Sequence, residues 1–349
     1  MVGRTSSARR DPGSRSARPR QDPLVGTVQN PFLRAGSMSV ITDWSAEKAA
    51  AFTHDTTHFR HALHERSMFD DDGLARTLDE YPRDKLGIFT MGEDPVAWTT
   101  WRRGSAGDLS GAELLAAAKA GRIWLNLRET NKYLQAYAEL SDEIFADKAQ
   151  HAPHAPTFKR DVGLLISSAN AQVFYHLDVA LVSLWQLRGV KRVWIYPVAE
   201  PFVSDQALER IVLREAAEQF AFDPAWDASA IQVELKPGEM VSWTQNAPHR
   251  IENGSMLNVS LSIEFMTPRA LMRANVIYAN GVLRRRLPGL ISAHPTIEAG
   301  FGPTALAKAA IARGAKAVGL QKAHERKLPA TFTLDPAEPG VLKALEQAA

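Results

Sequence analysis

The chain of 349 residues contains no cysteine. This absence excludes disulfides, a thiol nucleophile, iron–sulfur clusters and every zinc site built on thiolates. It agrees with a reducing compartment, and we expect the protein in the cytoplasm. A strong excess of charge is also missing, because 41 lysines and arginines stand against 39 aspartates and glutamates, a net charge of +2. The composition therefore does not predict bulk electrostatic binding to nucleic acid or to an anionic membrane.

Long apolar runs are missing as well. No stretch approaches the ~18 consecutive apolar residues that a membrane-spanning helix requires. No apolar segment precedes a small-residue cleavage site near the N-terminus, so we expect neither a membrane span nor a secretory signal. Hydrophobic residues make up 45% of the chain, which is enough for a sizeable buried core. We interpret the chain as one elaborated soluble domain rather than two.

Residues 1–37 differ in composition from the rest of the chain. They contain seven arginines but only two acidic residues, together with several prolines, glycines and serines. Such segments can bind nucleic acid or act as transit peptides, and they are also typical of disordered tails. We predict a disordered basic extension here, with Met38 as an alternative start.

The apolar periodicity of the remaining sequence predicts helices at both ends. Residues 38–120 are interpreted as a helical region that packs on the core, with helix-spaced apolar residues between Asp43 and Tyr81. Ser110 and Glu113 have the spacing of a capping box. Residues 269–349 are interpreted as a second helical region, with helices at Leu271–Val282 and 304–327.

Residues 121–268 have a different pattern, in which short apolar segments are separated by turn residues. This pattern is typical of an antiparallel sandwich or barrel, with a helical insertion near 204–220. The predicted strands are Ile123–Leu127, Val162–Ile166, Gln172–His176, Val179–Gln186, Lys191–Tyr196, Ile231–Leu235, Met240–Trp243, Arg250–Asn253 and Leu257–Phe265. The sequence thus predicts a mainly β protein with flanking helices.

Three residues of this middle region form a candidate metal site. His176 and Asp178 stand two apart, so in a strand they project from the same face. His249 follows a turn that leads into another predicted strand, and it can supply a third ligand. Two imidazoles and one carboxylate form the facial triad of non-haem Fe(II) oxygenases.

The sequence around these residues resembles a known family. It reads HLDVALVSLWQLRGVKRVWIYP around the first two residues and LKPGEMVSWTQNAPHRIEN…NVSLSIEF around the third. Over roughly residues 120–268 these words are similar to the JmjC-type, cupin-like family of Fe(II)- and 2-oxoglutarate-dependent oxygenases. The resemblance implies a double-stranded β-helix (jelly-roll) core, with Fe(II) and 2-oxoglutarate as cofactors and dioxygen as co-substrate. It implies that His176, Asp178 and His249 are the catalytic iron ligands.

The resemblance also implies a cation for the distal carboxylate of 2-oxoglutarate. Lys191 stands fifteen residues after the first ligand, where some members have such a lysine. Arg192 is the alternative, but successive strand residues face opposite sides, so only one of the two faces inward. We favour Lys191.

Other polar residues are expected to line the same pocket. Asn126 shares a strand face with Arg128, at a place that lines the co-substrate or substrate pocket in related folds. Arg128 can hold an acidic substrate or form a structural salt bridge. Asn258 and Ser260, near the last predicted strand, can supply further polar contacts.

Two positions in the region expected to bind the co-substrate depart from the family pattern. Many members have Ser or Thr three residues before the first ligand and Asn six residues after it, where this chain has Val173 and Val182. We predict a hydroxylase of an unidentified substrate (small molecule, lipid or protein side chain), with a homodimer formed through the flanking helices. The alternatives are a metal-binding cupin enzyme that does not use 2-oxoglutarate and a non-catalytic cupin-like regulatory or binding protein.

Two further groups of residues are interpreted as structural. His54, His58, His61 and His64 recur at helical spacing, yet no HExxH pattern accompanies them, so we interpret them as a polar helix face rather than a zinc site. Arg284, Arg285 and Arg286 follow the end of a predicted helix, where cations interact favourably with the helix dipole. We do not expect them to bind nucleic acid.

Overall fold

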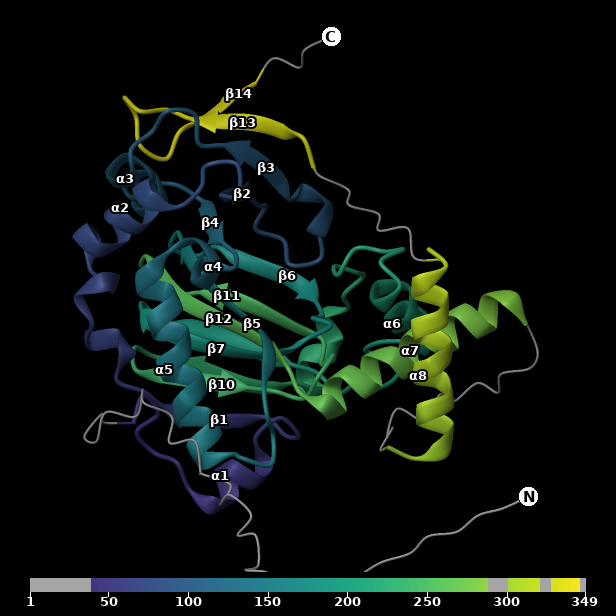
Figure 1. Cartoon of the computed structure of the whole chain (residues 1–349). Coiled ribbons are helices and arrows are strands. Elements are labelled where there is room, and N and C mark those ends of the chain that lie inside the picture. Colours follow the sequence, from purple (N-terminus) through teal and green to yellow (C-terminus); the bar gives the residue numbers. More distant parts are fainter. Residues whose placement is uncertain (1–38, 288–300, 321–327, 346–349) are drawn as a thin grey trace, which may run out of the picture. The chain divides into compact units, whose positions relative to one another are not determined.

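The computed structural model describes residues 39–287, 301–320 and 328–345 (Figure 1). The predicted basic extension 1–37 lies outside these residues, as does the part 321–327 of the predicted helix 304–327. None of the described helices has the length and apolarity that crossing a bilayer requires.

Eight consecutive strands form two antiparallel sheets that face each other. The strands are β5 (Phe158–Ser167), β6 (Gln172–His176), β7 (Leu181–Arg188), β8 (Lys191–Ile195), β9 (Ile231–Leu235), β10 (Glu239–Ser242), β11 (His249–Asn253) and β12 (Asn258–Met266). The large sheet contains the order β10-β7-β12-β5, and the small sheet has the order β6-β11-β8-β9. This arrangement is a double-stranded β-helix. The predicted fold class, a mainly β jelly roll flanked by helices, is confirmed.

The large sheet is longer than the jelly roll requires. On one side β1 (Thr57–Arg60) pairs with β10. On the other side β5 is followed by β4 (Ile123–Leu127), β2 (Gly87–Thr90), β3 (Arg102–Ser105), β13 (Ala330–Leu334) and β14 (Leu342–Ala344). The terminal regions therefore contribute strands as well as helices, and the continuous helical pattern predicted between Asp43 and Tyr81 is wrong. Strands of three to five residues are too short to show a period of two.

The α-helices lie in two groups, one on the large sheet and one beside the metal-ligand candidates. They are α1 (Ala46–Ala51), α2 (Asp71–Glu80), α3 (Gly111–Ala120), α4 (Thr130–Tyr133), α5 (Gln135–His151), α6 (Asp205–Val212), α7 (Pro268–Arg286) and α8 (Pro303–Ala317). Short 3-10 turns lie at Leu63–Glu65, Ser67–Phe69, Trp98–Thr100 and Pro224–Ser229. The predicted capping box of Ser110 and Glu113 is confirmed at the start of α3. Helices α6, α7 and α8 share a separate apolar cluster that includes Leu177.

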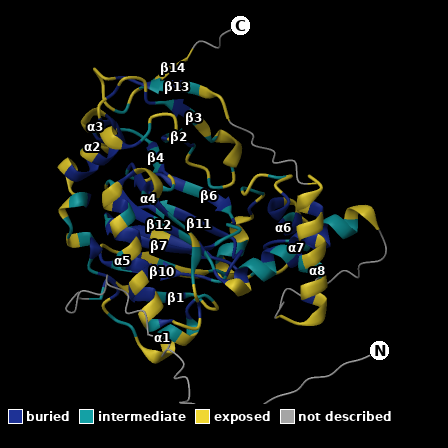
Figure 2. Ribbon diagram, viewed as in Figure 1, coloured by how far each residue is buried: buried dark blue, intermediate teal, exposed yellow. Residues whose placement is uncertain are grey.

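The central strands of the large sheet are mostly buried (Figure 2), and alternation along them gives the sheet two different faces. On β12, Val259, Leu261 and Ile263 belong to the main apolar core, together with residues of α2, α3 and α5. The intervening Asn258 and Ser260 are also buried, but they face the interior of the jelly roll. This interior thus contains polar side chains, which a purely structural core does not need.

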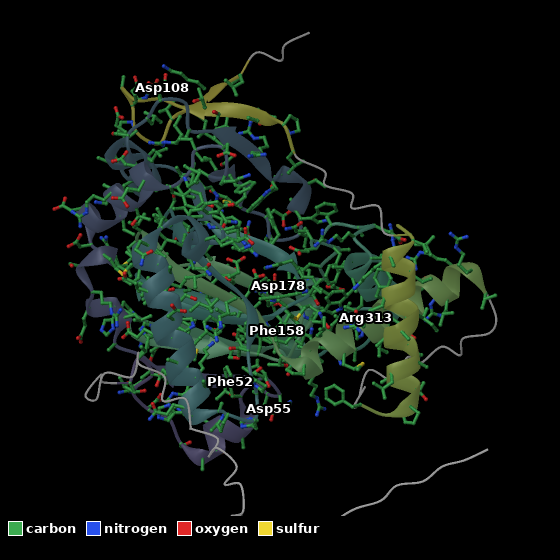
Figure 3. The ribbon with its side chains drawn as sticks, viewed as in Figure 1. Phe52, Asp55, Asp108, Phe158, Asp178 and Arg313 are labelled. Atoms are coloured by element: carbon green, nitrogen blue, oxygen red, sulfur yellow. The ribbon has the colours of Figure 1, made fainter. Side chains whose placement is uncertain are left out.

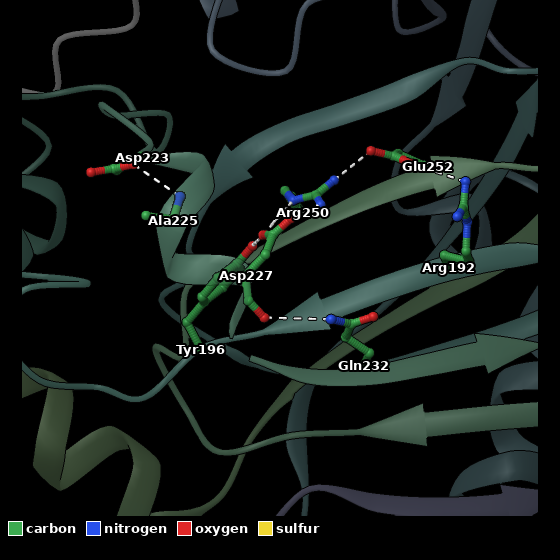
Figure 4. A network of polar contacts seen from close by, with 8 residues as sticks. All are labelled: Arg192, Tyr196, Asp223, Ala225, Asp227, Gln232, Arg250 and Glu252. Carbon is green, nitrogen blue, oxygen red and sulfur yellow. Dashed lines mark hydrogen bonds and ion pairs between the residues drawn. The ribbon is translucent and has the colours of Figure 1, made fainter. Parts of the chain in front are cut away.

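A network of charged and polar side chains covers part of the outer face of the small sheet (Figure 4). The Arg250 guanidinium lies 3.6 Å from the Trp194 ring centroid and pairs with Asp227 and with Glu252. Its Nε donates to the Tyr196 hydroxyl at 3.1 Å. Because Asp227 belongs to the Pro224–Ser229 turn, the network fixes the insertion between β8 and β9 to this outer face.

A buried lysine lies in the main core. Lys148 of α5 is 1% exposed, and its Nζ lies 4.3 Å from the Phe265 ring centroid and 3.4 Å from the Ser183 hydroxyl. Burial lowers the pKa of Lys148 to about 7. The unfolded chain therefore binds more protons than the folded chain between about pH 7 and pH 10, and this lysine makes the folded state more stable as the pH rises.

Replacing this lysine with methionine tests that linkage. We expect Lys148→Met to be more stable than wild type at pH 7, and the difference in unfolding free energy to shrink by roughly 1 kcal/mol per pH unit up to pH 9. Urea unfolding at pH 7, 8 and 9 measures it, with the exposed Lys236→Met as control. A difference that does not change with pH would contradict the prediction.

Candidate metal centre

The three predicted ligands meet at one end of the jelly roll. His176 ends β6, His249 begins β11, and the two residues are direct partners in the antiparallel ladder. Asp178 follows β6, and Figure 3 shows it at the end of the sheets that faces α6 and α7. One ligand atom from each residue lies within 4.8 Å of the others. Within the described parts of the chain, no other group of histidine and acidic residues has this geometry.

Backbone carbonyls determine the tautomer of both histidines. The Nδ1 of His176 lies 2.8 Å from the Phe174 carbonyl, and that of His249 lies 3.0 Å from the Ala247 carbonyl. A carbonyl only accepts, so each Nδ1 carries the proton and each Nε2 keeps a lone pair for a metal. Burial, and next the charge of a protonated His176, lowers the pKa of His249 to about 4. The neutral imidazole, which is the metal-binding form, is therefore favoured.

The aspartate is placed to complete the same site. Its Oδ2 lies 3.4 Å from the His249 Nε2, and because that nitrogen carries no proton, the contact is not a hydrogen bond. Asn246, at φ 66°, donates from Nδ2 to the Asp178 carbonyl at 2.9 Å and accepts from Arg273 of α7 at 3.1 Å. Asn246 thus connects the two ligand loops. In the sequence Asn246 lies in the turn before His249, and an asparagine there is compatible with a positive φ.

Lys191 lies in the jelly-roll interior behind the triad. It is 2% exposed, and its ammonium makes no hydrogen bond or ion pair with any described residue. Val193 and Ile195, on the same face of β8, belong to the interior apolar cluster. Arg192 faces outward instead and pairs with Glu252 at 3.2 Å. Burial lowers the pKa of Lys191 to about 7, so an anion that enters this interior gains a strong partner.

The other predicted pocket residues differ in their contacts. The Asn126 Oδ1 is buried and has no hydrogen-bond partner among the described residues. Asn258 and Ser260 are both hydrogen-bonded to the Gln186 side chain, at 2.8 and 2.7 Å. Asn126 thus keeps one polar atom without a hydrogen bond among the described residues. Asn258 and Ser260 instead form part of the pocket wall, where their side chains are bonded to Gln186. Val182 belongs to the interior apolar cluster.

Several charged side chains lie near Asp178. Arg128 pairs with Glu264 at 2.5 Å and with Asp161 at 2.8 Å, so it forms the structural salt bridge rather than a free clamp for an acidic substrate. Glu218 is exposed to solvent on one side, and many protein atoms lie around its carboxylate. Protein burial, and next the charge of Asp178, raises the pKa of Glu218 to about 7. Burial also raises the pKa of Glu264 to about 7. We call Asp161, Glu218, Glu264 and Arg128 the charged rim.

The histidine stripe predicted as a helix face is not helical. His58 lies in β1, His61 forms an isolated bridge with Ile41, and His64 lies in a 3-10 turn. His61 is buried, and its two ring nitrogens lie 3.2 Å from the Leu63 nitrogen and the Glu239 carbonyl. His61 therefore has a structural role, and the predicted helix through these histidines is wrong.

The arginines that end α7 also have structural partners. Arg284 pairs with Glu209 at 3.0 Å, and Arg285 pairs with Glu215. These ion pairs hold α7 to α6 and to the segment that follows it.

Comparisons with known proteins give structural likenesses only. No protein-family model matches the chain, and a search of curated proteins found no match. The ribosomal oxygenase YcfD from Escherichia coli, solved with cobalt and 2-oxoglutarate, is 14% identical at a TM-score of 0.41, over 81% of this chain and 71% of that chain. Another YcfD structure is 16% identical at a TM-score of 0.40, over 78% of this chain and 66% of that chain, slightly less than two thirds of its length.

A Drosophila melanogaster CENP-C cupin domain is 13% identical at a TM-score of 0.21, over 30% of this chain and 55% of that chain. The structural neighbours thus include a ribosomal oxygenase and a cupin domain.

Proposed function

We propose that this protein is an Fe(II)- and 2-oxoglutarate-dependent oxygenase, and that it hydroxylates its substrate. The observation that carries the proposal is the pairing of two features in one jelly roll. One is a triad of His176, Asp178 and His249 with its Nε2 atoms free. The other is Lys191, a buried ammonium without a partner among the described residues.

The residues of the triad fit a ferrous ion. Two neutral imidazoles and one carboxylate on a single side leave the opposite coordination positions open. When bound, Fe(II) supplies the activation of dioxygen, with 2-oxoglutarate oxidised to succinate and carbon dioxide while one oxygen atom enters the substrate. The protein's own part is to hold the ligands in the correct tautomer, through the carbonyls of Phe174 and Ala247.

Lys191 fits the distal carboxylate of 2-oxoglutarate. A buried dicarboxylate requires a compensating charge at its far end, and a buried ammonium requires an anion. Asn126 adds an amide to the same interior, since it shares a strand face with Trp124, which packs against the interior cluster. Asn258 and Ser260 act through the wall that they form with Gln186.

A second candidate is a cupin enzyme that uses the metal without 2-oxoglutarate. The apolar Val173 and Val182 favour it, because both pack against the interior cluster and neither can hydrogen-bond to a carboxylate.

Anaerobic titration separates the two candidates. We expect wild-type protein with one equivalent of Fe(II) to develop a visible metal-to-ligand charge-transfer band on addition of 2-oxoglutarate, and His176→Ala to develop none. Admission of air is then expected to yield succinate, measured by chromatography. Metal binding without a band would favour the second candidate.

A further inference from the structure

The segment that carries Asp178 has little backbone support of its own. Strand β6 ends at His176, and residues 177–180 lie outside the strands. The Leu177 nitrogen donates to the Glu218 carbonyl at 3.3 Å, but the described backbone provides no donor for the carbonyls of Asp178 and Val179. Because a carboxylate ligand is only as well placed as the backbone that carries it, other groups must fix this segment.

Two side-chain amides of the loop before His249 supply the missing donors. The Gln245 Nε2 donates to the Val179 carbonyl at 2.8 Å, and the Asn246 Nδ2 donates to the Asp178 carbonyl at 2.9 Å. Both side chains are buried, at 5% and 2% exposed, where a hydrogen bond is stronger than in water. The loop that leads to one candidate ligand thus holds the backbone of another.

The same two amides join this loop to α7. The Gln245 Nε2 also lies 3.2 Å from the Ala270 carbonyl, and the Asn246 Oδ1 accepts from the Arg273 Nε at 3.1 Å. Ala270 belongs to the main apolar core, so the first turn of α7 is firmly anchored. Leu177, between the two ligands of the β6 segment, packs in the cluster that α6, α7 and α8 share. Helix α7 therefore supports the ligand segment through both polar and apolar contacts.

The backbone of Asn246 indicates what its side chain contributes. Its φ is 66°, in the left-handed region that glycine adopts without steric cost and that other residues adopt rarely. The turn itself would therefore be satisfied by glycine. The asparagine adds the two hydrogen bonds that reach the Asp178 carbonyl and α7.

We propose that Gln245 and Asn246 are positioning residues of the metal centre, which fix the Asp178 carboxylate through its backbone and use the first turns of α7 as their support. The proposal rests on the metal centre of the proposed function, and it adds two residues whose amides face the backbone rather than the metal. It follows that metal affinity depends on α7 as well as on the three ligands.

Titration with Co(II) in the absence of 2-oxoglutarate tests this proposal in two variants. Asn246→Gly keeps the positive φ without strain and removes the amide, and Gln245→Met keeps the length of the side chain but removes the donor. Each is expected to lower Co(II) affinity by about 10- to 100-fold, as for partners that orient a metal ligand. The visible bands of the bound ion are also expected to shift, because the carboxylate no longer has a fixed position.

The matched control is Gln172→Met. Gln172 lies on β6 with His176, is 6% exposed, and donates from Nε2 to the Gly92 carbonyl at 2.7 Å. This variant therefore also loses a buried hydrogen bond from an amide to a carbonyl, but not one to the ligand segment. We expect it to lose thermal stability as Gln245→Met does, yet to bind Co(II) with the affinity and the spectrum of wild type. Melting temperatures of the metal-free proteins show which variants are folded, and either test variant alone is sufficient.

The outcomes separate this inference from the proposed function. Wild-type affinity, or a wild-type spectrum of the bound ion, in a folded test variant overturns the inference. An equal loss of affinity in Gln172→Met also overturns it, because the effect would then be general destabilisation. A wild-type protein that binds Co(II) but forms no band with Fe(II) and 2-oxoglutarate rejects the proposed function and leaves the inference standing. A wild-type protein that binds no Co(II) rejects both.

Discussion

Replacement of Asp178 with alanine is expected to lower the affinity for divalent metal by more than about a hundredfold and to abolish turnover. Loss of a residue that merely hydrogen-bonds to a metal ligand costs 10–100-fold in affinity, so loss of a ligand costs more. Without Asp178, the ion is held only by the two neutral imidazoles of His176 and His249, and no ligand neutralises its positive charge. Titration with Co(II), followed by its visible absorption, measures the affinity directly, and wild type is expected to saturate at one equivalent.

The same substitution is expected to leave the metal-free fold intact. The Asp178 carboxylate makes no hydrogen bond to the unprotonated His249 Nε2, and it adds to the negative charge shared with Glu218 and Glu264. Its removal therefore relieves repulsion, and the melting temperature of metal-free Asp178→Ala is expected to equal or exceed that of wild type. The exposed Asp84→Ala serves as the control. Unchanged Co(II) affinity in Asp178→Ala would remove the basis of the proposed metal centre.

The grouping of the three candidate ligands could be predicted from the sequence more readily than the contacts around them, for a physical reason. His176, Asp178 and His249 stand at strand ends, and strand ends in the jelly roll are defined by strong local signals such as the Pro-Gly turn before β10 and the Asn-Ala-Pro turn before β11. The period of two also predicted that only one of Lys191 and Arg192 faces inward. These are local rules, and they need no knowledge of the tertiary contacts.

The parts that the sequence could not predict depend on contacts between distant residues. The strand β1 pairs with β10, and β13 pairs in parallel with β3, more than 200 residues away. The charged rim draws Arg128 and Asp161 together with Glu218 and Glu264, which lie on separate elements of the chain. Glu218 in particular lies within the insertion predicted near 204–220, after the end of α6, where nothing in the local sequence marks a side chain beside the candidate ligands.

Replacement of Lys191 with methionine is expected to weaken binding of 2-oxoglutarate by about 10- to 100-fold while metal binding is retained. A hydrogen bond to a charged group contributes about 1.5–3 kcal/mol, and in this variant a buried dianion loses the ammonium proposed to face its distal carboxylate. The metal-free protein is expected to become more stable, because a buried ammonium without a described partner is replaced by an apolar side chain of similar length. Thermal unfolding in the absence of ligand measures this second effect.

The neighbouring residue provides a matched control. Arg192 follows Lys191 in β8 but faces outward and pairs with Glu252, so Arg192→Met removes a cation without changing the interior. Wild type and Arg192→Met are expected to bind 2-oxoglutarate equally in the anaerobic charge-transfer titration. Equal weakening in both variants would show that net charge, rather than the inward ammonium, determines affinity.

A second ligand, which lacks the distal carboxylate, tests the same role of Lys191. The keto acid 2-oxovalerate has the chain length of 2-oxoglutarate but lacks the distal carboxylate, so wild type is expected to discriminate strongly between the two and Lys191→Met to discriminate little.

Because the pKa of Lys191 is lowered to about 7, the free protein is mostly neutral at this position above that pH and takes up a proton when the dianion binds. Affinity for 2-oxoglutarate is therefore expected to fall as the pH rises from 7 to 9 in wild type and to lose this dependence in Lys191→Met. A wild-type affinity that is independent of pH over this range would show that a group other than Lys191 binds the distal carboxylate.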